Sequence, residues 1–499
     1  MTSFDLLMQG FAVATTPKNL LLCLVGCMWG TAVGILPGLG PMAGMALLLP
    51  LTFGLDPAGA VIMLSGIFYG AMYGGSTTSI LLRIPGEAAS VITCLDGYEM
   101  ARKGRAGSAL SIAAIGSFIG GTFSIVGLMV AAPLLAEAML KVGPAAEAIL
   151  MLLALLVVAV VSAGPVVKTL AMVVLGLALA TIGLDPLTAH PRFMFGNLEL
   201  ADGMSVVALS IGLFGVSELL ISLETRMVET PKAPTMRELI PSAEEVKQAA
   251  PAVARGSIIG FLFGIVPGVS HIVSTFVSYA VEKKLSRNPE TFGHGNVAGL
   301  AGPETANNAT TGSAMIPLLV LGIPAIPATS ILLSALLIHN VQPGPLLLIE
   351  RPDVFWGLIA SMYIGNIILL VLNLPLVGLF VGLLRTPWGY LMPTVLLICV
   401  IGVYSVKGSG FDLTVMAVSG VGGYFLRKFG FDVAPLLLAF VVGERLEKSF
   451  LTALTISDGN YATFVQGPAV RVFLAVFAVI FALQGAAWLI SGRQKVTLK

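Results

Sequence analysis

The polar side chains that could bind small ions gather at two interruptions of otherwise apolar sequence, residues 73–90 and 304–330. Hydroxyls, side-chain amides and unwound backbone carbonyls are hard, neutral oxygen ligands that suit sodium. The first turn of a helix presents free N–H groups and the positive end of the helix dipole, which suit a carboxylate. The residue types at the two interruptions therefore predict a site that binds an organic anion together with a cation.

The candidate site residues form two groups, according to the ligand that they would contact. The candidate substrate-binding residues are Gly38, Gly40, Ser76, Thr77, Arg83, Pro85, Gly86, Gly268, Ser270 and Pro324. The candidate cation-binding residues are Gly74, Thr78, Asn307, Asn308, Thr310 and Thr311. The alternative for any single serine or threonine is a hydrogen bond back to its own helix, which is common.

The ionisable residues nearest the interruptions are Arg83 and Glu304. A charge at membrane depth costs roughly 2.5–3.5 kcal/mol on insertion scales, so each is a functional hypothesis by default. The alternatives are that Arg83 reaches the membrane surface and that Glu304 caps the start of a helix. His271 could titrate near neutral pH, although a lone histidine is more often a packed residue that forms hydrogen bonds.

The elements that must position these residues include one stretch that occurs twice, GCMWGTAVGILPGLGP at 26–41 and GSIIGFLFGIVPGVSH at 256–271. Glycines at every fourth position allow close approach of another helix within a bilayer. A Pro-Gly break at membrane depth is tolerated only where protein or a polar cavity satisfies the freed backbone groups. Broken helices at corresponding places in two halves are typical of a transporter binding site. The matching residues are Gly26, Gly30, Gly34, Pro37 and Gly38 with Gly256, Gly260, Gly264, Pro267 and Gly268.

The two polar interruptions also match each other, at slightly larger offsets. Ile84-Pro85 corresponds to Ile323-Pro324, as small insertions in the second copy would produce. The remaining matches are Gly66, Thr77 and Thr78 with Gly299, Thr310 and Thr311.

The composition is that of a polytopic membrane protein. Of 499 residues, 57% are hydrophobic and 11% are charged, whereas a soluble domain carries about 25% charged residues. The net charge of +1 provides no basic surface for nucleic acid. Cys23 and Cys27 share a helix face, but their apolar neighbours favour small buried residues over a transition-metal pair. The absence of HExxH, GxSxG and Walker A patterns argues against an enzyme, and no cofactor is expected.

The predicted fold is all-α, with two inverted structural repeats, Gly/Pro-broken re-entrant hairpins and roughly 11–12 transmembrane segments. The basic loops at 102–105 and 223–255 should be cytoplasmic, and this placement makes the two halves inverted. The first repeat is 1–222, with breaks at 34–44 and 73–90; a cytoplasmic linker is 223–255; the second repeat is 256–450, with breaks at 264–274 and 304–330; a last transmembrane helix and cytoplasmic tail are 451–499.

Several motifs, in matching order from about residue 8 to residue 470, resemble the large membrane subunit of tripartite tricarboxylate transporters, the TctA family. The resemblance implies the translocating subunit of a symporter in the bacterial inner membrane, with sodium or proton as the coupling ion. It also implies a small four-helix membrane subunit, a periplasmic solute-binding protein and a carboxylate substrate. The motifs are GILPGLGP (34–41), YGAMYGGSTTSILLRIPGE (69–87), LDGY (95–98), GLDP…RFMFG (183–196), ETANNA (304–309), IPLLVLGIP (316–324) and QPGP (342–345).

The expected function is therefore cation-coupled, inward transport of an organic anion by a secondary carrier. One alternative is an anion-selective, channel-like pore, which could not concentrate its solute. A second alternative, an integral membrane enzyme that acts on lipid carriers, is disfavoured because an acidic metal motif is missing.

Overall fold

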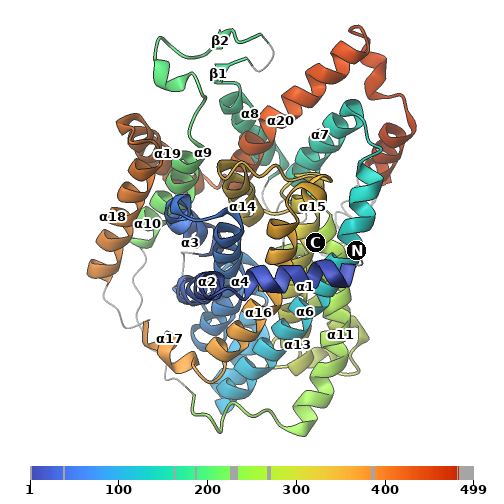
Figure 1. The fold of residues 1–499 in the computed structure, drawn as a ribbon. Helices are drawn as coiled ribbons and strands as arrows, with labels where there is room; N and C mark the ends of the chain where they lie inside the picture. The colour runs from blue at the N-terminus through green and yellow to red at the C-terminus, as the bar shows by residue number, and fades with distance from the viewer. Residues whose placement is uncertain are drawn as a thin grey trace, which may run out of the picture.

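The computed structural model describes residues 3–36, 40–161, 165–185, 188–224, 234–266, 271–383, 388–479 and 482. Within these ranges the chain is helical apart from loops and one antiparallel ribbon, β1 (Gly183–Leu184) with β2 (Pro191–Arg192) (Figure 1). The helices before residue 223 are α1 (Ser3–Ala14), α2 (Pro17–Ile35), α3 (Gly40–Leu48), η1 (Leu49–Gly54), α4 (Pro57–Leu82), η2 (Ala88–Val91), α5 (Thr93–Met100), η3 (Ala101–Arg105), α6 (Ala106–Met139), α7 (Pro144–Val161), α8 (Val166–Ala180), η4 (Leu198–Leu200), α9 (Val206–Ser210), η5 (Ile211–Val216) and α10 (Ser217–Ser222).

The second half begins with a helix pair that resembles α2 and α3 in its order along the chain. Its helices are α11 (Ala243–Ile265), α12 (His271–Leu285), η6 (Pro289–Thr291), α13 (Val297–Ser313), η7 (Pro317–Leu321), α14 (Pro327–Ile338), α15 (Leu347–Glu350), α16 (Pro352–Asn373), α17 (Val377–Leu383), α18 (Trp388–Lys407), α19 (Gly410–Lys428), α20 (Ala434–Ile456), η8 (Tyr461–Phe464) and a helix at Pro468–Val479.

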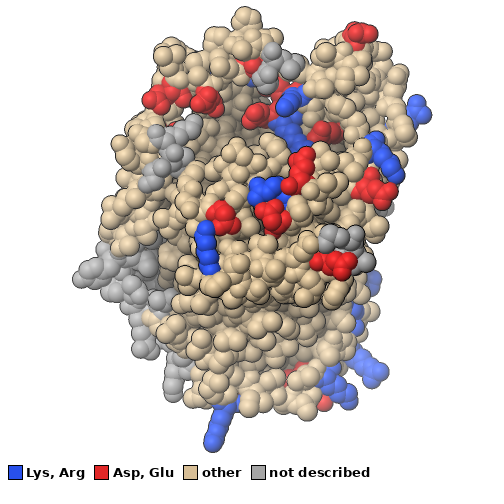
Figure 2. All heavy atoms as spheres, in the orientation of Figure 1, with Lys and Arg blue, Asp and Glu red and all other residues tan. Residues whose placement is uncertain are grey.

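The length and composition of these helices confirm an all-α polytopic membrane protein. Five helices in the described ranges are long and apolar enough to cross a membrane, and shorter apolar helices accompany them. The face in Figure 2 is mostly uncharged, with acidic and basic side chains spread over its upper and middle parts and along its lower edge. The five candidate spans are Pro17–Ile35, Pro57–Leu82, Thr93–Met139, Ala243–Ile265 and Pro352–Asn373.

The first glycine stripe is a packing seam between α2 and α4. A methyl group built at Gly30 would overlap the carbonyl oxygen of Ile67, and one built at Gly34 would overlap that of Ala71. From the other side, a Cβ at Gly74 would overlap the carbonyl oxygen of Thr31. The two helices are therefore parallel and in backbone contact, as glycines spaced by four permit.

The second glycine stripe forms the same kind of seam between α11 and α13. A Cβ at Gly256 would meet the carbonyl oxygen of Gly302, and one at Gly260 would meet that of Ala306. This register makes Ala306 the counterpart of Ile67. It differs by six residues from the alignment that the sequence match of Thr77 with Thr310 implies. The shift arises because packing follows the glycines and is independent of the hydroxyls further along each helix.

The two parallel helix pairs meet where α4 crosses α13 in the opposite direction. Ser76 in α4 donates a hydrogen bond to Glu304 in α13. One turn later in α4, Ile80 lies against Gly97, which is also contacted by Leu300, one turn earlier in α13. Increasing residue number along α4 therefore corresponds to decreasing residue number along α13.

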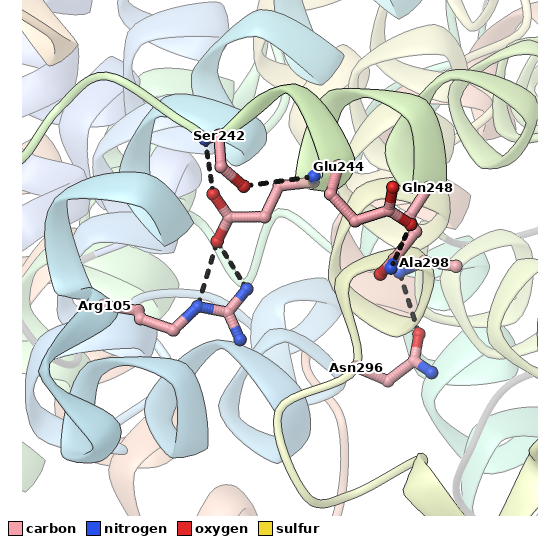
Figure 3. A network of polar contacts seen from close by, with 7 residues as sticks. Arg105, Ser242, Glu244, Gln248, Asn296 and Ala298 are labelled. Atoms are coloured by element: carbon pink, nitrogen blue, oxygen red, sulfur yellow. Dashed lines mark hydrogen bonds and ion pairs between the residues drawn. The ribbon is translucent and has the colours of Figure 1, made fainter.

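The starts of α11 and α13 and the end of η3, directly before α6, lie close together (Figure 3). Arg105 Nε is 2.9 Å from Glu245 Oε1, and Glu245 Oε2 accepts a 2.6 Å hydrogen bond from the backbone N–H of Ser242. Lys103 Nζ donates to the carbonyl oxygen of His294 at 2.6 Å. The expectation that the basic loops at 102–105 and 223–255 share one side agrees with these contacts. The side of the membrane on which they lie stays a prediction.

Three boundaries differ from the expected ones. The polar segment 223–255 is helical from Ala243, where Ser242 and Glu245 form a reciprocal capping box, so its last part is the first part of α11. The expected break at 73–90 is narrower, because α4 continues to Leu82. The expected break at 304–330 is also narrower, because helical structure continues through η7 to Leu321.

Candidate functional site

A cavity of about 700 Å³ lies where the helix breaks of both halves come together. The first residues of four α-helices line it: Gly40 to Ala43 in α3, His271 and Ile272 in α12, Pro327 and Ala328 in α14, and Ala434 and Pro435 in α20. Residues 85–89 of the break after α4 line it as well. Its volume is within the range of small-molecule sites, roughly 300–1,000 Å³. The early turns of several helices are thus directed to one space.

The two breaks that follow α4 and α13 have the same backbone conformation, at a constant offset of 239 residues (322 − 83 = 239). Arg83 has φ 59° and ψ 24°, and Gly322 has φ 67° and ψ 24°. Both are left-handed residues that end a helix and precede Ile-Pro. Glu87 and Ile326 then occupy equivalent extended positions before η2 and α14.

A hydroxyl three residues further on closes each break in the same way. Ser90 Oγ accepts from the backbone N–H of Glu87 at 3.3 Å and donates to its carbonyl oxygen at 2.8 Å. Thr329 Oγ1 makes the equivalent contacts with Ile326 at 3.2 and 2.7 Å. A chain that repeats an unusual left-handed turn, an Ile-Pro step and a hydroxyl clasp has two copies of one structural unit.

The cavity wall carries one basic side chain, Arg427, and three acidic ones, Glu87, Glu218 and Asp432, among its described residues. Arg427 forms an ion pair with Glu218, and its guanidinium lies 5.9 Å from the centre of the Phe214 ring. The positive charge of Arg427 and the negative charge of Glu218 therefore both lie at the cavity surface, and the pair adds little net charge to it.

Behind the wall, Glu304 is 1% exposed and holds together three segments of the chain. Its Oε2 accepts a 2.5 Å hydrogen bond from Ser76 in α4, and its Oε1 accepts one from Thr93 in α5. Glu304 lies in the middle of α13, whose start is capped by Asn296. The expectation that Glu304 caps a helix start is therefore wrong, because the helix begins a full two turns earlier.

The candidate substrate-binding residues occupy three kinds of position. Gly40, Pro85 and Gly86 line the cavity, and Pro324 is buried directly before the lining residue Ala325. Ser76 and Thr77 are buried in α4 away from the cavity wall, beside a void of about 10 Å³. The remaining candidates Gly38, Gly268 and Ser270 lie outside the described residues.

Arg83 does not line the cavity. Its side chain is exposed, and its guanidinium lies 5.7 Å from the centre of the Tyr98 ring. This position corresponds to the surface alternative considered for Arg83. The cavity's basic group is Arg427, which comes from α19 and lies far along the sequence from either break.

The candidate cation-binding residues face several directions around α4 and α13. Thr78, Thr310 and Thr311 donate to carbonyl oxygens of their own helices, at 3.2, 2.8 and 2.9 Å, and Gly74 is a packing contact with α2. Asn308 Nδ2 donates to Ser117 Oγ at 2.7 Å beside a void of about 20 Å³.

Asn307 and Thr311 are the members of this group whose side chains form hydrogen bonds with cavity-lining residues. Asn307 Nδ2 donates to Glu87 Oε1 at 3.1 Å, while its Oδ1 is buried and has no hydrogen-bond partner among the described residues. Thr311 lies one layer behind the wall, where its Oγ1 is 3.1 Å from His271 Nε2.

Two residues that position the site were not singled out from the sequence. Asp96, in the LDGY motif, is fully buried, and its Oδ1 accepts from the backbone N–H groups of Gly293, Gly295 and Asn296 at 3.0, 2.8 and 2.7 Å. Asp96 therefore fixes the loop from which α13 starts. The signal was available, because an aspartate between two apolar segments needs several donors to be buried.

Arg445 is the second of these residues, and it fixes the position of the second break. It donates to Glu147 Oε1 in α7 through Nε at 2.8 Å and to the carbonyl oxygen of Pro343 through Nη1 at 2.8 Å. The guanidinium fills the space beside Gly322, where a Cβ would overlap it. The left-handed residue of the second break is therefore glycine for two reasons, its conformation and this close approach.

Comparison with known proteins identifies relatives along nearly the whole chain. A family model described as the tripartite tricarboxylate transporter TctA family matches residues 20–438. An uncharacterized 52.8 kDa protein in the TAR-I ttuC' 3' region of Agrobacterium vitis is 44% identical over 467 residues, which cover 94% of this chain and 93% of that protein. An uncharacterized protein in the TAR-II ttuC' 3' region of Agrobacterium vitis is 46% identical over 226 residues, covering 45% of this chain and 93% of that protein.

No solved structure matches the chain. The family match covers most of the sequence, and it includes the helix breaks that surround the cavity. The chain therefore belongs to the tripartite tricarboxylate transporter TctA family and is a membrane-embedded transporter subunit.

Proposed function

We propose that this chain is the translocating subunit of a secondary active transporter that carries an organic carboxylate inward, driven by a cation gradient. The observation that carries this proposal is the convergence of the first turns of α3, α12 and α14 on one cavity. Helix N-termini stabilise an anion without a buried excess of basic side chains. The wall's basic residue, Arg427, is paired with Glu218, so the helix termini would supply most of the attraction.

The repeated geometry supports a carrier over an open pore. The breaks that follow the left-handed residues Arg83 and Gly322 contribute residues 85–89 and 325–328 to the same cavity, and α4 and α13 run in opposite directions where Ser76 meets Glu304. Two copies of one unit in opposite orientations are the usual basis of alternating access around a fixed site. On this proposal the halves are inverted repeats, and their relative motion exposes the cavity to each side in turn.

The remaining elements of the proposal concern the coupling ion and the partners. The coupling ion is sodium or a proton, with Asn307 and Thr311 placed directly behind the cavity wall and Asn308 beside a water-sized void. The partners are a small four-helix membrane subunit and a periplasmic solute-binding protein, in the bacterial inner membrane. These partners rest on the family's tripartite organisation.

The proposal is tested by uptake into proteoliposomes that contain the chain, with its small membrane subunit and candidate binding protein supplied. Radiolabelled citrate and a panel of di- and tricarboxylates serve as substrates, with sodium and pH gradients imposed separately. We expect accumulation above the outside concentration that requires one of the gradients. Equilibration without accumulation under every gradient would instead indicate a pore.

A further inference from the structure

We propose that Glu87 is the residue that binds a coupling proton, with Asn307 as its positioning partner and Glu304 as the neighbouring carboxylate that favours the proton there. This inference rests on the proposed transport function and assigns its coupling ion to a particular side chain. It is carried by the hydrogen bonds around the first helix break.

Glu87 is the acidic residue of the break that lines the cavity. Its Oε2 accepts a 2.8 Å hydrogen bond from the backbone N–H of Ala89, and its Oε1 accepts the 3.1 Å bond from Asn307 Nδ2. None of the ion pairs among the described residues includes Glu87. Glu87 is partly buried, and a partly buried carboxylate that lacks a basic partner is stabilised when it takes up a proton.

Asn307 provides an independent indication of that proton. Its Oδ1 is a buried acceptor without a donor, although its Nδ2 is bonded to Glu87. An ionised Glu87 can only accept hydrogen bonds, whereas a protonated Glu87 has an O–H to donate. The O–H would complete a two-bond acid–amide pair, with Nδ2–H to Oε1 and O–H to Oδ1. A proton on Glu87 would thus provide the donor that Oδ1 of Asn307 lacks. An ionised Glu87 would leave that oxygen without a donor.

Glu304 contributes a second carboxylate at close quarters. It lies one helical turn before Asn307 in α13, and its two oxygens are occupied by the hydroxyls of Ser76 and Thr93. Two carboxylates in a buried cluster repel each other when both are ionised, and one proton removes the repulsion. The hydroxyls of Ser76 and Thr93 can donate to both oxygens of Glu304, whereas Oδ1 of Asn307 lacks a donor; we therefore assign the proton to Glu87.

The other charged or titratable groups on the cavity wall do not replace the proton. Arg427 is paired with Glu218. Asp432 accepts a hydrogen bond from the backbone N–H of Ala434 at 3.0 Å. His271 has its Nε2 directed to Thr311. The wall therefore offers Glu87 no free cation among the described residues.

The coupling step requires only the transfer of a proton. A proton from cavity water adds to the carboxylate oxygen of Glu87 and forms one O–H bond, and the same bond breaks when the proton leaves on the other side. The neutral acid no longer repels an anionic substrate in the cavity. By the reciprocity of linked binding, the anion must strengthen proton binding by the same factor that the proton strengthens anion binding. The equivalent position in the second break is Ile326, so the duplicated unit supplies one such site per chain.

Infrared titration of the complete purified chain in lipid nanodiscs tests the proton site without any substrate. When the pH is raised from mildly acidic to mildly alkaline, we expect the wild type to lose a carbonyl band of a protonated carboxylic acid. The band should be absent from Glu87→Gln and retained by Glu290→Gln, which removes an exposed acid in η6. Asn307→Leu, a second variant at the site, should move the pH at which the band disappears. A band that persists unchanged in Glu87→Gln would overturn the assignment.

Citrate transport in proteoliposomes, with the membrane subunit and binding protein supplied, tests the coupling. We expect citrate affinity of the wild type to change by up to about tenfold per pH unit, the limit for linkage to one proton. Glu87→Gln should lose this dependence and should not accumulate citrate in a pH gradient. Accumulation by Glu87→Gln at the wild-type level, driven by the pH gradient, would overturn the inference and leave the proposed function intact. No uptake by the wild type under any gradient would instead refute the proposed function, and the infrared assignment would still be decided.

Discussion

Ser76 Oγ donates a 2.5 Å hydrogen bond to Glu304 Oε2, and this bond joins α4 to α13 at the place where the two helix pairs cross. Both residues are nearly inaccessible to solvent. The contact therefore ties together the break-bearing helices of both halves, while Thr93 connects the same carboxylate to α5.

Replacement of Ser76 by alanine should lower the stability of the folded protein. Without the Ser76 hydroxyl, Oε2 of the buried Glu304 loses a hydrogen-bond donor that offsets its removal from water. We therefore expect the free energy of unfolding to fall by about 1–3 kcal/mol. Thermal unfolding in detergent would measure it. The matched control is Ser210→Ala, since the Ser210 hydroxyl is buried without a partner among the described residues. Equal losses in the two variants would show that the hydrogen bond to Glu304 contributes little.

Replacement of Gly260 by alanine should disturb assembly of α11 against α13, because its methyl group would overlap the carbonyl oxygen of Ala306. We expect reduced yield of folded protein by fluorescence-detected size-exclusion chromatography, and a larger effect for leucine. Gly422→Ala is the control, because a Cβ at that helical position meets no atom within 4 Å. That control should gain up to about 1 kcal/mol from the higher helix propensity of alanine. Normal behaviour of Gly260→Leu would contradict the packing seam.

Replacement of Arg427 by glutamine should impair carboxylate uptake more than replacement of Arg83. Arg427 lines the cavity, whereas Arg83 is exposed beside Tyr98. Without Arg427, Glu218 remains as an unpaired carboxylate on the cavity wall and repels an anionic substrate, so we expect an affinity at least roughly tenfold weaker, which is about 1.4 kcal/mol. Uptake at low substrate concentration would report it. The double variant with Glu218→Gln separates loss of folding from loss of binding. Abolished uptake in Arg83→Gln with normal uptake in Arg427→Gln would reverse the assignment.

Cysteines introduced at Lys18 and Lys103 should be labelled from opposite sides of the membrane. Lys18 pairs with Asp56 at the start of α4, whereas Lys103 contacts His294 beyond the far end of that helix. An impermeant maleimide applied to right-side-out vesicles should label only Lys18→Cys. All four native cysteines are buried, so background labelling should be small. Labelling of both positions from the same side would contradict the orientation.

The sequence predicted the features that depend on neighbouring residues. The Gly30 and Gly260 seams and the two Ile-Pro breaks follow from local spacing, and the structure confirms them. The widths of the breaks were predicted less well, because Thr78 and Thr311 return their hydroxyls to their own helices and leave those helices intact. Polar composition alone does not unwind a helix when each hydroxyl has a carbonyl within reach.

The parts of the candidate site that escaped prediction depend on packing between distant segments. Arg427 reaches the cavity only because α19 packs against the π-helical turn η5. The surroundings of Glu304 likewise require α4, α5 and α13 to meet. The environment of Glu304 could not be derived from the ETANNA motif, because the motif does not show where the helix that contains Glu304 begins.

Arg445 has a mechanical consequence. Its guanidinium donates hydrogen bonds to Glu147 in α7 and to the Pro343 carbonyl oxygen, and it fills the space beside Gly322. The second break is thereby connected to α7 and α20, whereas the first break is connected to α13 through the hydrogen bond between Glu87 and Asn307. The two breaks that line the cavity are therefore held by different helices, so any displacement of α7 and α20 relative to α13 would change the width of the cavity between them.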